Sequence, residues 1–336
     1  GFRLGASDLH LTHGGQGLSA HIRLHGRLCP LDKVPPPQAV AGLFNQLRVW
    51  ARLNPEESRV PQDAWMDWKG RQIRLALLPS LEGESAVLRL LSGEALSLDS
   101  ILSLSGLCAS TLTRAASGLI LVVGATGSGK TTTLNAWVRH KVEQKLHILT
   151  LEDPVEYPVP QALMVSVQPE IGLDFASGLK AFLRHDPDVI VIGEIRDAIT
   201  LNTALEAALA GKLVLSTLHA ADACGALVRL RHMGATPDLL AGGLRAVLAQ
   251  QLLPIPCNQE ACAAWRSGPL APMALGAASW SCEICHDTGY QGRQAICEYL
   301  PITESFWPLF QAGASEVEFR AQALKEGLQP FALHRR

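Results

Sequence analysis

The sequence predicts an α/β protein: a small amino-terminal α+β domain, then a parallel-sheet domain with a cysteine-rich insert and a helical tail. Three observations predict this class. Residues 1–92 alternate apolar and polar positions, as half-buried strands do. From residue 118 onward, near-continuous apolar runs alternate with helical patterns, which is typical of parallel strands covered on both faces. A glycine-rich loop follows the first of these runs.

Length and composition limit the possible functions. A chain of 336 residues can hold two or three domains, and its 48% hydrophobic and 18% charged residues suit a soluble globular protein. The net charge of −2 gives no electrostatic case for a nucleic acid partner. The apolar runs are far shorter than the ~20 residues of a membrane span.

The start, Gly1-Phe-Arg-Leu4, has neither an apolar signal segment nor an initiating Met, so we expect a trimmed chain in the cytoplasm. In that compartment clustered cysteines indicate a metal site rather than disulfide bonds.

The amino-terminal domain, residues 1–92, is predicted from two alternating segments and one helical stretch. Residues 18–24 and 72–77 alternate as strands, and residues 37–53 form the helical stretch. The segment that begins at Ser92-Gly-Glu is predicted to be a linker over 93–117.

Residues 118–254 are predicted to form a nucleotide-binding core. Its elements follow in order along the chain: strands 119–123, 147–151, 189–192 and 213–216, with helices after Lys130 and over 175–184, 198–209 and 239–253. A cysteine-rich module is assigned to 255–299, and a truncated carboxy-terminal helical segment to 300–336, with an amphipathic helix over 316–324.

The stretch Gly124-Ala-Thr-Gly-Ser-Gly-Lys130-Thr131 fits G-x-x-x-x-G-K-[ST], between a strand and a helix, as the phosphate-loop motif requires. Backbone N–H groups of such a loop form an anion cradle with the helix N-terminus. Lys130 is expected to reach the β- and γ-phosphates, and Thr131 to hold Mg²⁺. The predicted phosphate-binding residues are Gly124, Ala125, Thr126, Gly127, Ser128, Gly129, Lys130, Thr131 and Thr132. The alternative is a glycine-rich turn that matches by chance.

Polar residues end three of the predicted core strands, where ligands of nucleotide-binding sheets lie. Glu194 ends strand 189–192 and is predicted to face the γ-phosphate and to position the attacking water. Glu152 and Asp153 follow a second strand, and His219 a third. Each has a plainer explanation: a solvent-facing Glu, an Asp-Pro turn and a surface His.

Four cysteines, Cys257, Cys262, Cys282 and Cys285, are spaced for a tetrahedral Zn²⁺ site with four thiolates. The first pair is wider than usual, and His286 and Cys297 are substitute ligands. The alternatives are a degenerate site that binds no metal and free surface thiols.

Together these motifs resemble the secretion and pilus-assembly ATPases of type II secretion and type IV pilus systems, the GspE/PilB group. Further similar segments occur in family order: Ser7-Asp-Leu-His-Leu11, Arg59-Val-Pro-Gln-Asp63, residues 78–91, 148–157, 183–197, 213–222 and Gly289-Tyr-Gln-Gly-Arg293. The resemblance implies a PAS-like (N2-type) domain and a RecA-like ATPase domain with nucleotide bound between them.

The resemblance also implies roles and partners. Glu194 would be the catalytic carboxylate, Glu152 and Asp153 an acidic box, and His219 a nucleotide sensor. Arg74 would reach the phosphates from the amino-terminal domain, with Arg59 a weaker candidate. The protein would be a homo-hexamer that uses ATP, Mg²⁺ and Zn²⁺ and acts on an inner-membrane platform protein of the GspF/PilC type. A further partner would recruit the ring by its cytoplasmic domain, and membrane contact would come only through partners.

Two departures keep an alternative open. Ala64-Trp65 stands where the family has Gly-Arg, and Gln251-Leu-Leu-Pro-Ile-Pro256 stands where it has a basic run. A nucleotide-binding paralogue with weak hydrolysis, acting as a regulatory or structural ring subunit, is therefore the second hypothesis. The cysteine pairs argue against a retraction-type pilus ATPase, and the near-neutral charge against a DNA translocase.

Overall fold

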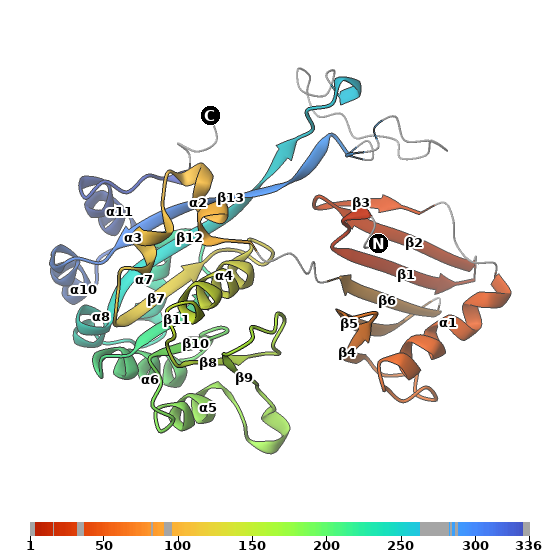
Figure 1. The fold of residues 1–336 in the computed structure, drawn as a ribbon, viewed down its shortest axis with the longest axis horizontal. Helices are drawn as coiled ribbons and strands as arrows, with labels where there is room; N and C mark the ends of the chain where they lie inside the picture. Colours follow the sequence, from red (N-terminus) through yellow and green to blue (C-terminus); the bar gives the residue numbers. More distant parts are fainter. Residues whose placement is uncertain are drawn as a thin grey trace. The chain divides into compact units, whose positions relative to one another are not determined.

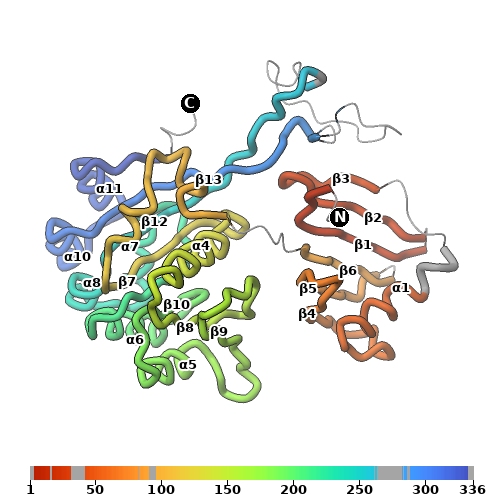
Figure 2. The backbone as a smooth tube through the Cα atoms, in the orientation of Figure 1, coloured from red at the N-terminus to blue at the C-terminus, as the bar shows by residue number. Residues whose placement is uncertain are grey.

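The computed structural model describes residues 4–15, 17–31, 37–81, 83–90, 96–262, 282, 284–285 and 288–331. The chain divides into two compact units, which Figures 1 and 2 trace by colour along the sequence. The amino-terminal unit comprises Gly1–Glu94 and Pro254–Arg293. The nucleotide-binding unit comprises Ala95–Leu253 and Gln294–Arg336.

One antiparallel sheet and one long helix, α1 (Pro37–Trp50), form the body of the amino-terminal unit, as the alternating pattern predicts. The strand order is β3-β2-β1-β6-β5-β4, and every neighbouring pair is antiparallel. Alternate side chains of β5, Ile73, Leu75 and Leu77, are buried against α1 residues such as Phe44. The strands are β1 (Asp8–Gly14), β2 (Gly17–Leu24), β3 (Arg27–Pro30), β4 (Gln62–Trp68), β5 (Arg71–Ser80) and β6 (Gly83–Leu90).

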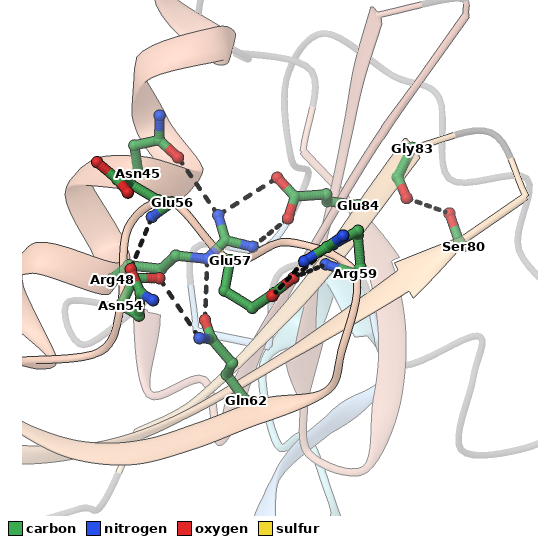
Figure 3. Close-up of polar contacts among 10 residues, drawn as sticks. All are labelled: Asn45, Arg48, Asn54, Glu56, Glu57, Arg59, Gln62, Ser80, Gly83 and Glu84. Carbon is green, nitrogen blue, oxygen red and sulfur yellow. Dashed lines mark hydrogen bonds and ion pairs between the residues drawn. The ribbon is translucent and has the colours of Figure 1, made fainter.

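A buried arginine fixes α1 to this sheet (Figure 3). Arg48 is 1% exposed, and its guanidinium donates to Gln62 Oε1 at 3.0 Å and to Asn45 Oδ1 at 3.4 Å. It also forms an ion pair with Glu84. Gln62 and Glu84 belong to two of the segments that resemble the ATPase family, so part of that resemblance has a structural role in this unit.

The second sheet has the order β13-β12-β7-β11-β10-β8-β9, and β7 lies between β12 and the central strand β11 (Figure 1). From β12 to β9, all adjacent strands are parallel, which confirms the predicted parallel sheet. The strands are β7 (Gly118–Val123), β8 (Ile148–Glu152), β9 (Leu163–Ser166), β10 (Val189–Ile192), β11 (Leu213–Leu218), β12 (Leu244–Pro256) and β13 (Tyr290–Pro301).

Helices cover both faces of this sheet, and β7 shows how its side chains divide. Leu119, Leu121 and Val123 face one apolar cluster, and Ile120 and Val122 face the other. The first cluster includes residues of α5 (Phe175–Phe182), α6 (Ala198–Leu209), α7 (Ala223–His232), α8 (Pro237–Gly243), α10 (Trp307–Ala312) and α11 (Glu316–Lys325). The second includes residues of α2 (Leu98–Leu102), α3 (Ala109–Thr113) and α4 (Lys130–Val142). Short 3₁₀ helices are η2 (Ser103–Ser105), η3 (Pro169–Ile171), η4 (Glu260–Cys262) and η5 (Glu304–Phe306).

The segment assigned to a linker, 93–117, is largely part of the nucleotide-binding unit. Leu98, Leu102 and Leu112 are buried in the same cluster as Trp137 of α4. Their apolar side chains recur too briefly for a helical period to be recognised in the sequence, but burial against α4 stabilises two short helices there.

The helix predicted over 239–253 is wrong. The helix α8 ends at Gly243, and Leu244 begins the long strand β12, which pairs with β7. Ala, Leu and Gln in this segment favour helix, but pairing beside a buried inner strand outweighs that preference. The predicted tail helix is confirmed as α11, with a capping box formed by Ser315 and Glu318.

Candidate nucleotide-binding site

The phosphate loop joins β7 to α4, as predicted, and two of its glycines are required by its shape. A Cβ at Gly124 would lie 2.4 Å from Ser128 Oγ and 2.5 Å from the carbonyl O of Gln250. Gly129 caps α4 with a φ of 89°, a left-handed conformation that a residue with a Cβ rarely adopts. The tight turn and the close approach of β12 therefore leave no room for side chains at these positions.

Lys130 is held inside the loop. Its Nζ donates to the carbonyl oxygens of Gly124 and Ala125, both at 2.9 Å. Burial lowers the pKa of Lys130, and the negative charge of Glu194 partly opposes this shift. The first turn of α4 adds unpaired N–H groups and the positive end of the helix dipole. The loop therefore presents positive charge to an anion.

One buried polar atom in the loop tests whether a phosphate fits. Among the side chains of the described residues, Ser128 Oγ is one of four buried polar atoms with no hydrogen-bond partner. A hydroxyl that donates to a phosphate oxygen would satisfy it. Thr131 and Thr132 follow in the first turn of α4, where both are partly buried. A hydroxyl at Thr131 is a suitable oxygen ligand for Mg²⁺.

The ends of three strands bring together predicted site residues in one charged network. Glu194 Oε1 lies 3.2 Å from Nε2 of His219. Arg196 Nε donates to Glu194 Oε2 at 3.0 Å, and Arg196 Nη1 donates to Asp153 Oδ2 at 3.4 Å. Arg196, which the sequence analysis missed, thus links Glu194 to Asp153, while His219 contacts Glu194 directly.

The main chain that leads into Glu194 is fixed by hydroxyl groups of β11. Ser216 Oγ donates to the carbonyl of Ile192 at 2.8 Å, and Thr217 Oγ1 to that of Gly193 at 2.6 Å. The N–H of Ile195 in turn donates to Thr217 O at 3.0 Å. Bonds on both sides hold Glu194 in place, so its carboxylate is well positioned to act on a ligand.

Glu152 is the last residue of β8, and within the described part of the chain no hydrogen bond or ion pair joins it to Glu194, His219 or Arg196. Its carboxylate accepts a hydrogen bond from Thr150 Oγ1 at 2.8 Å. Desolvation raises the pKa of Glu152, and the negative charge of Glu156 raises it further. An acid with a raised pKa at a strand end is a candidate functional group.

The two arginines singled out in the first domain lie in the amino-terminal unit. Arg74, on β5 opposite Trp65 of β4, forms an ion pair with Asp63 at 3.1 Å. Arg59 is largely exposed and pairs with Glu57 at 2.9 Å. Both are charged groups at the surface of their unit, and a role for either in binding nucleotide stays a prediction.

All four predicted cysteine ligands meet in one buried cluster. Their sulfur atoms lie within 4.8 Å of one another, with Cys257 and Cys282 at 3.8 Å and Cys262 and Cys285 at 3.4 Å. Four thiolates about 2.3 Å from a central Zn²⁺ would lie ~3.8 Å apart, so the donor set fits a tetrahedral metal ion. Cys297 is not in this cluster; it is buried in the other unit, where its N–H donates to Ser105 Oγ. His286 lies outside the described residues.

The sequence analysis also missed Gln250, which contacts the phosphate loop from β12. Its Nε2 donates to the carbonyl of Ser128 at 2.7 Å, and its Oε1 accepts from Thr133 Oγ1 at 2.6 Å. The mistaken helix over 239–253 hid this contact. The one signal in the sequence that could have indicated Gln250 is its place as the polar residue directly after the apolar run that ends at Ala249.

A phosphate loop that follows an inner strand of a parallel sheet, with acids at the ends of other strands, defines a P-loop nucleotide-binding protein. The family model described as Type II/IV secretion system protein matches residues 2–334, and the chain belongs to this family. This confirms the resemblance seen in the motifs.

Among curated relatives, the type II secretion system protein HxcR of Pseudomonas aeruginosa is 39% identical over 336 residues, covering 96% of this chain and 69% of the relative. The type IV pilus assembly ATPase TfpB of Acinetobacter baylyi is 34% identical, covering 99% of this chain and 60% of the relative. The chain thus spans about two thirds of the length of such relatives.

Solved structures agree with this fold. The pilus retraction motor PilT with bound ADP matches with a TM-score of 0.65 and 25% identity, covering 99% of this chain and 93% of that structure. The Legionella pneumophila ATPase DotB matches with a TM-score of 0.70 and 21% identity, covering 99% and 87%.

Proposed function

We propose that this protein is an ATP-hydrolysing motor that drives assembly of a type IV pilus or a type II secretion pseudopilus. The observation that carries the proposal is Glu194, held at the end of β10 and close enough to the phosphate loop for its charge to act on Lys130. Relatives named as type II secretion proteins and as a type IV pilus assembly ATPase support it.

In this proposal the residues of the site divide the work. Lys130 exchanges its two loop carbonyls for phosphate oxygens, and the loop amides bind the remaining phosphate charge. Glu194 orients the attacking water, and His219 and Arg196 keep its carboxylate in place. Mg²⁺, held at Thr131, would neutralise the charge that develops on the phosphates. Glu152 and Asp153 serve as the acidic box beside it.

The finer architecture follows the family. The amino-terminal sheet with α1 is proposed to be a PAS-like domain, and the parallel sheet with its helices a RecA-like domain. Arg74 would reach the phosphates when the two close on ATP, which requires it to leave Asp63. In a homo-hexamer such closure and reopening would turn a platform protein in the inner membrane.

The proposed location is the cytoplasmic face of the inner membrane, reached through partner proteins. In the described ranges, no helix has both the length and the apolar character needed to cross a membrane.

We also propose a structural zinc ion bound by the four-cysteine cluster. Support comes from burial of all four thiols and from sulfur separations close to the edge of a zinc–thiolate tetrahedron. Such a site would stabilise a segment that has little apolar sequence of its own.

The second candidate is a ring subunit that binds nucleotide but hydrolyses it slowly. The ion pair between Arg74 and Asp63 and the presence of Trp65 opposite Arg74 favour it, because both leave fewer cations for the phosphates.

Phosphate release by the wild type and by Glu194→Gln separates the two candidates. The motor proposal predicts a loss of about 10²–10³-fold in rate with ADP affinity retained. Glu206→Gln, the same change at an exposed position of α6, should release phosphate at the wild-type rate. Equal rates for Glu194→Gln and the wild type would overturn the motor proposal and leave the slow ring subunit.

A further inference from the structure

The carboxamide of Gln250 links β12 to the phosphate loop and to α4. Gln250 is 2% exposed, so its hydrogen bonds are shielded from competing water. Its Nε2 donates to Ser128 O at 2.7 Å, and its Oε1 accepts from Thr133 Oγ1 at 2.6 Å. One planar group thus joins β12 to the phosphate loop and to α4, since Gln250 lies 122 residues after Ser128 and 117 after Thr133.

This bond orients a peptide group of the loop. In a trans peptide the C=O and the following N–H point in opposite directions across one rigid plane. A donor fixed on Ser128 O therefore turns the N–H of Gly129 away from β12. Backbone N–H groups of this loop are the ones that receive phosphate. Gln250 thus holds one loop amide in a set direction before any ligand arrives.

The loop is also shaped around this residue by contact. Cβ atoms added at Gly124 and Gly129 would lie 2.5 Å from the Gln250 carbonyl O and 2.7 Å from its Nε2. Real Cβ atoms do not approach so closely, so both glycines allow the loop to lie directly on Gln250. Gly124 thus faces the backbone of Gln250, and Gly129 faces its side chain.

We propose that Gln250 is a positioning residue that holds the phosphate loop in the shape that receives the phosphates of a nucleotide. The proposal deepens the proposed function and relies on it for the identity of the ligand. Gln250 acts through the loop peptide and touches no ligand itself. Only an amide serves here, because the position requires one donor for Ser128 O and one acceptor for Thr133 Oγ1.

Gln250→Glu tests the donor alone. As a carboxylate, glutamate keeps the size of the side chain and can still accept from Thr133, but it cannot donate to Ser128 O. ADP binding is therefore measured well above the ordinary pKa of a glutamate carboxyl, because a protonated carboxyl could still donate. We expect the dissociation constant of ADP to rise about tenfold, as for the loss of one ordinary hydrogen bond, with kcat for ATP nearly unchanged. Gln144→Glu, the same change at an exposed position just after α4, should leave ADP binding at the wild-type level.

Thr133 supplies a second, milder pair of variants in case Gln250→Glu does not fold. Thr133→Val removes the hydroxyl that orients the Gln250 amide, and Thr133→Ser keeps it. We expect weaker ADP binding for the valine variant and wild-type binding for the serine variant. Equal ADP affinity in both would overturn the proposal, as would a Gln250→Glu protein that loses thermal stability or kcat while its ADP affinity stays unchanged.

These outcomes are distinct from failure of the proposed function. A wild-type protein that binds ADP but releases no phosphate would refute the proposed motor function. The ADP affinities of these variants would still test whether Gln250 positions the phosphate loop.

Discussion

Replacing Arg48 by methionine should lower the free energy of unfolding of the amino-terminal unit by about 3 kcal/mol. Methionine keeps the apolar stem of the side chain and removes the guanidinium. The change leaves the carboxylate of Glu84 and the amide oxygen of Gln62 without the donor that the structure gives them (Figure 3).

The magnitude follows from burial on the two sides of the ion pair. The side chain of Arg48 is 2% exposed and that of Glu84 is 23% exposed. Breaking a fully buried pair from one side costs about 3–5 kcal/mol. Water can reach Glu84 in part, so the lower end of that range applies.

Hydrogen exchange measured by peptide mass spectrometry suits this protein, because it follows each of the two compact units by its own peptides. Amides of β5 and β6 should exchange about a hundredfold faster in Arg48→Met, and those of β7 and β11 at the wild-type rate. Arg59→Met removes an exposed pair with Glu57 and should change exchange very little. If Arg48→Met protects β5 and β6 as well as the wild type does, the buried pair is not what stabilises the unit.

Three further predictions concern the site and the cysteine cluster. Without nucleotide or Mg²⁺, the raised pKa of Glu152 means that wild-type stability falls as pH rises from 4.5 through the pKa of the folded state. The melting temperature of Glu152→Gln should therefore rise relative to that of the wild type as the pH increases above 4.5, and parallel curves would show that the carboxyl is not desolvated. Gly124→Ala should abolish ADP binding in calorimetry while circular dichroism stays native, because its Cβ would overlap Ser128 and Gln250. A strong chelator should remove one zinc per chain, found by metal analysis, and speed exchange around Cys257; a purified protein with no zinc would contradict the metal site.

The strands β7, β8, β10 and β11 of the nucleotide-binding unit were predictable because each is a short, continuous apolar run with a clear end. Strand β10 and helix α6 begin and end where the sequence predicts, and the phosphate loop lies between β7 and α4. These features depend on residues that are close in sequence, so local patterns were sufficient.

Features that depend on distant residues were not predictable. Arg48 looks like a solvated helix residue until Glu84 is brought to it from 36 positions away. The contact that identifies Arg196 as a site residue is with Asp153, 43 positions earlier. The segment of β12 forms a strand because it pairs with β7. Composition favoured a helix for β12, and the one local signal, a polar residue after Ala249, could not show that Gln250 contacts the phosphate loop.

The bonds from Lys130 to the loop carbonyls have a consequence for ligand choice. An incoming anion competes with Gly124 and Ala125 for the ammonium group, so part of its binding free energy is spent on displacing them. A ligand with one phosphate regains little binding free energy, because it lacks the β- and γ-oxygens that Lys130 would contact. We therefore expect the loop to discriminate by phosphate number, with AMP and free phosphate as poor competitors of ADP and ATP.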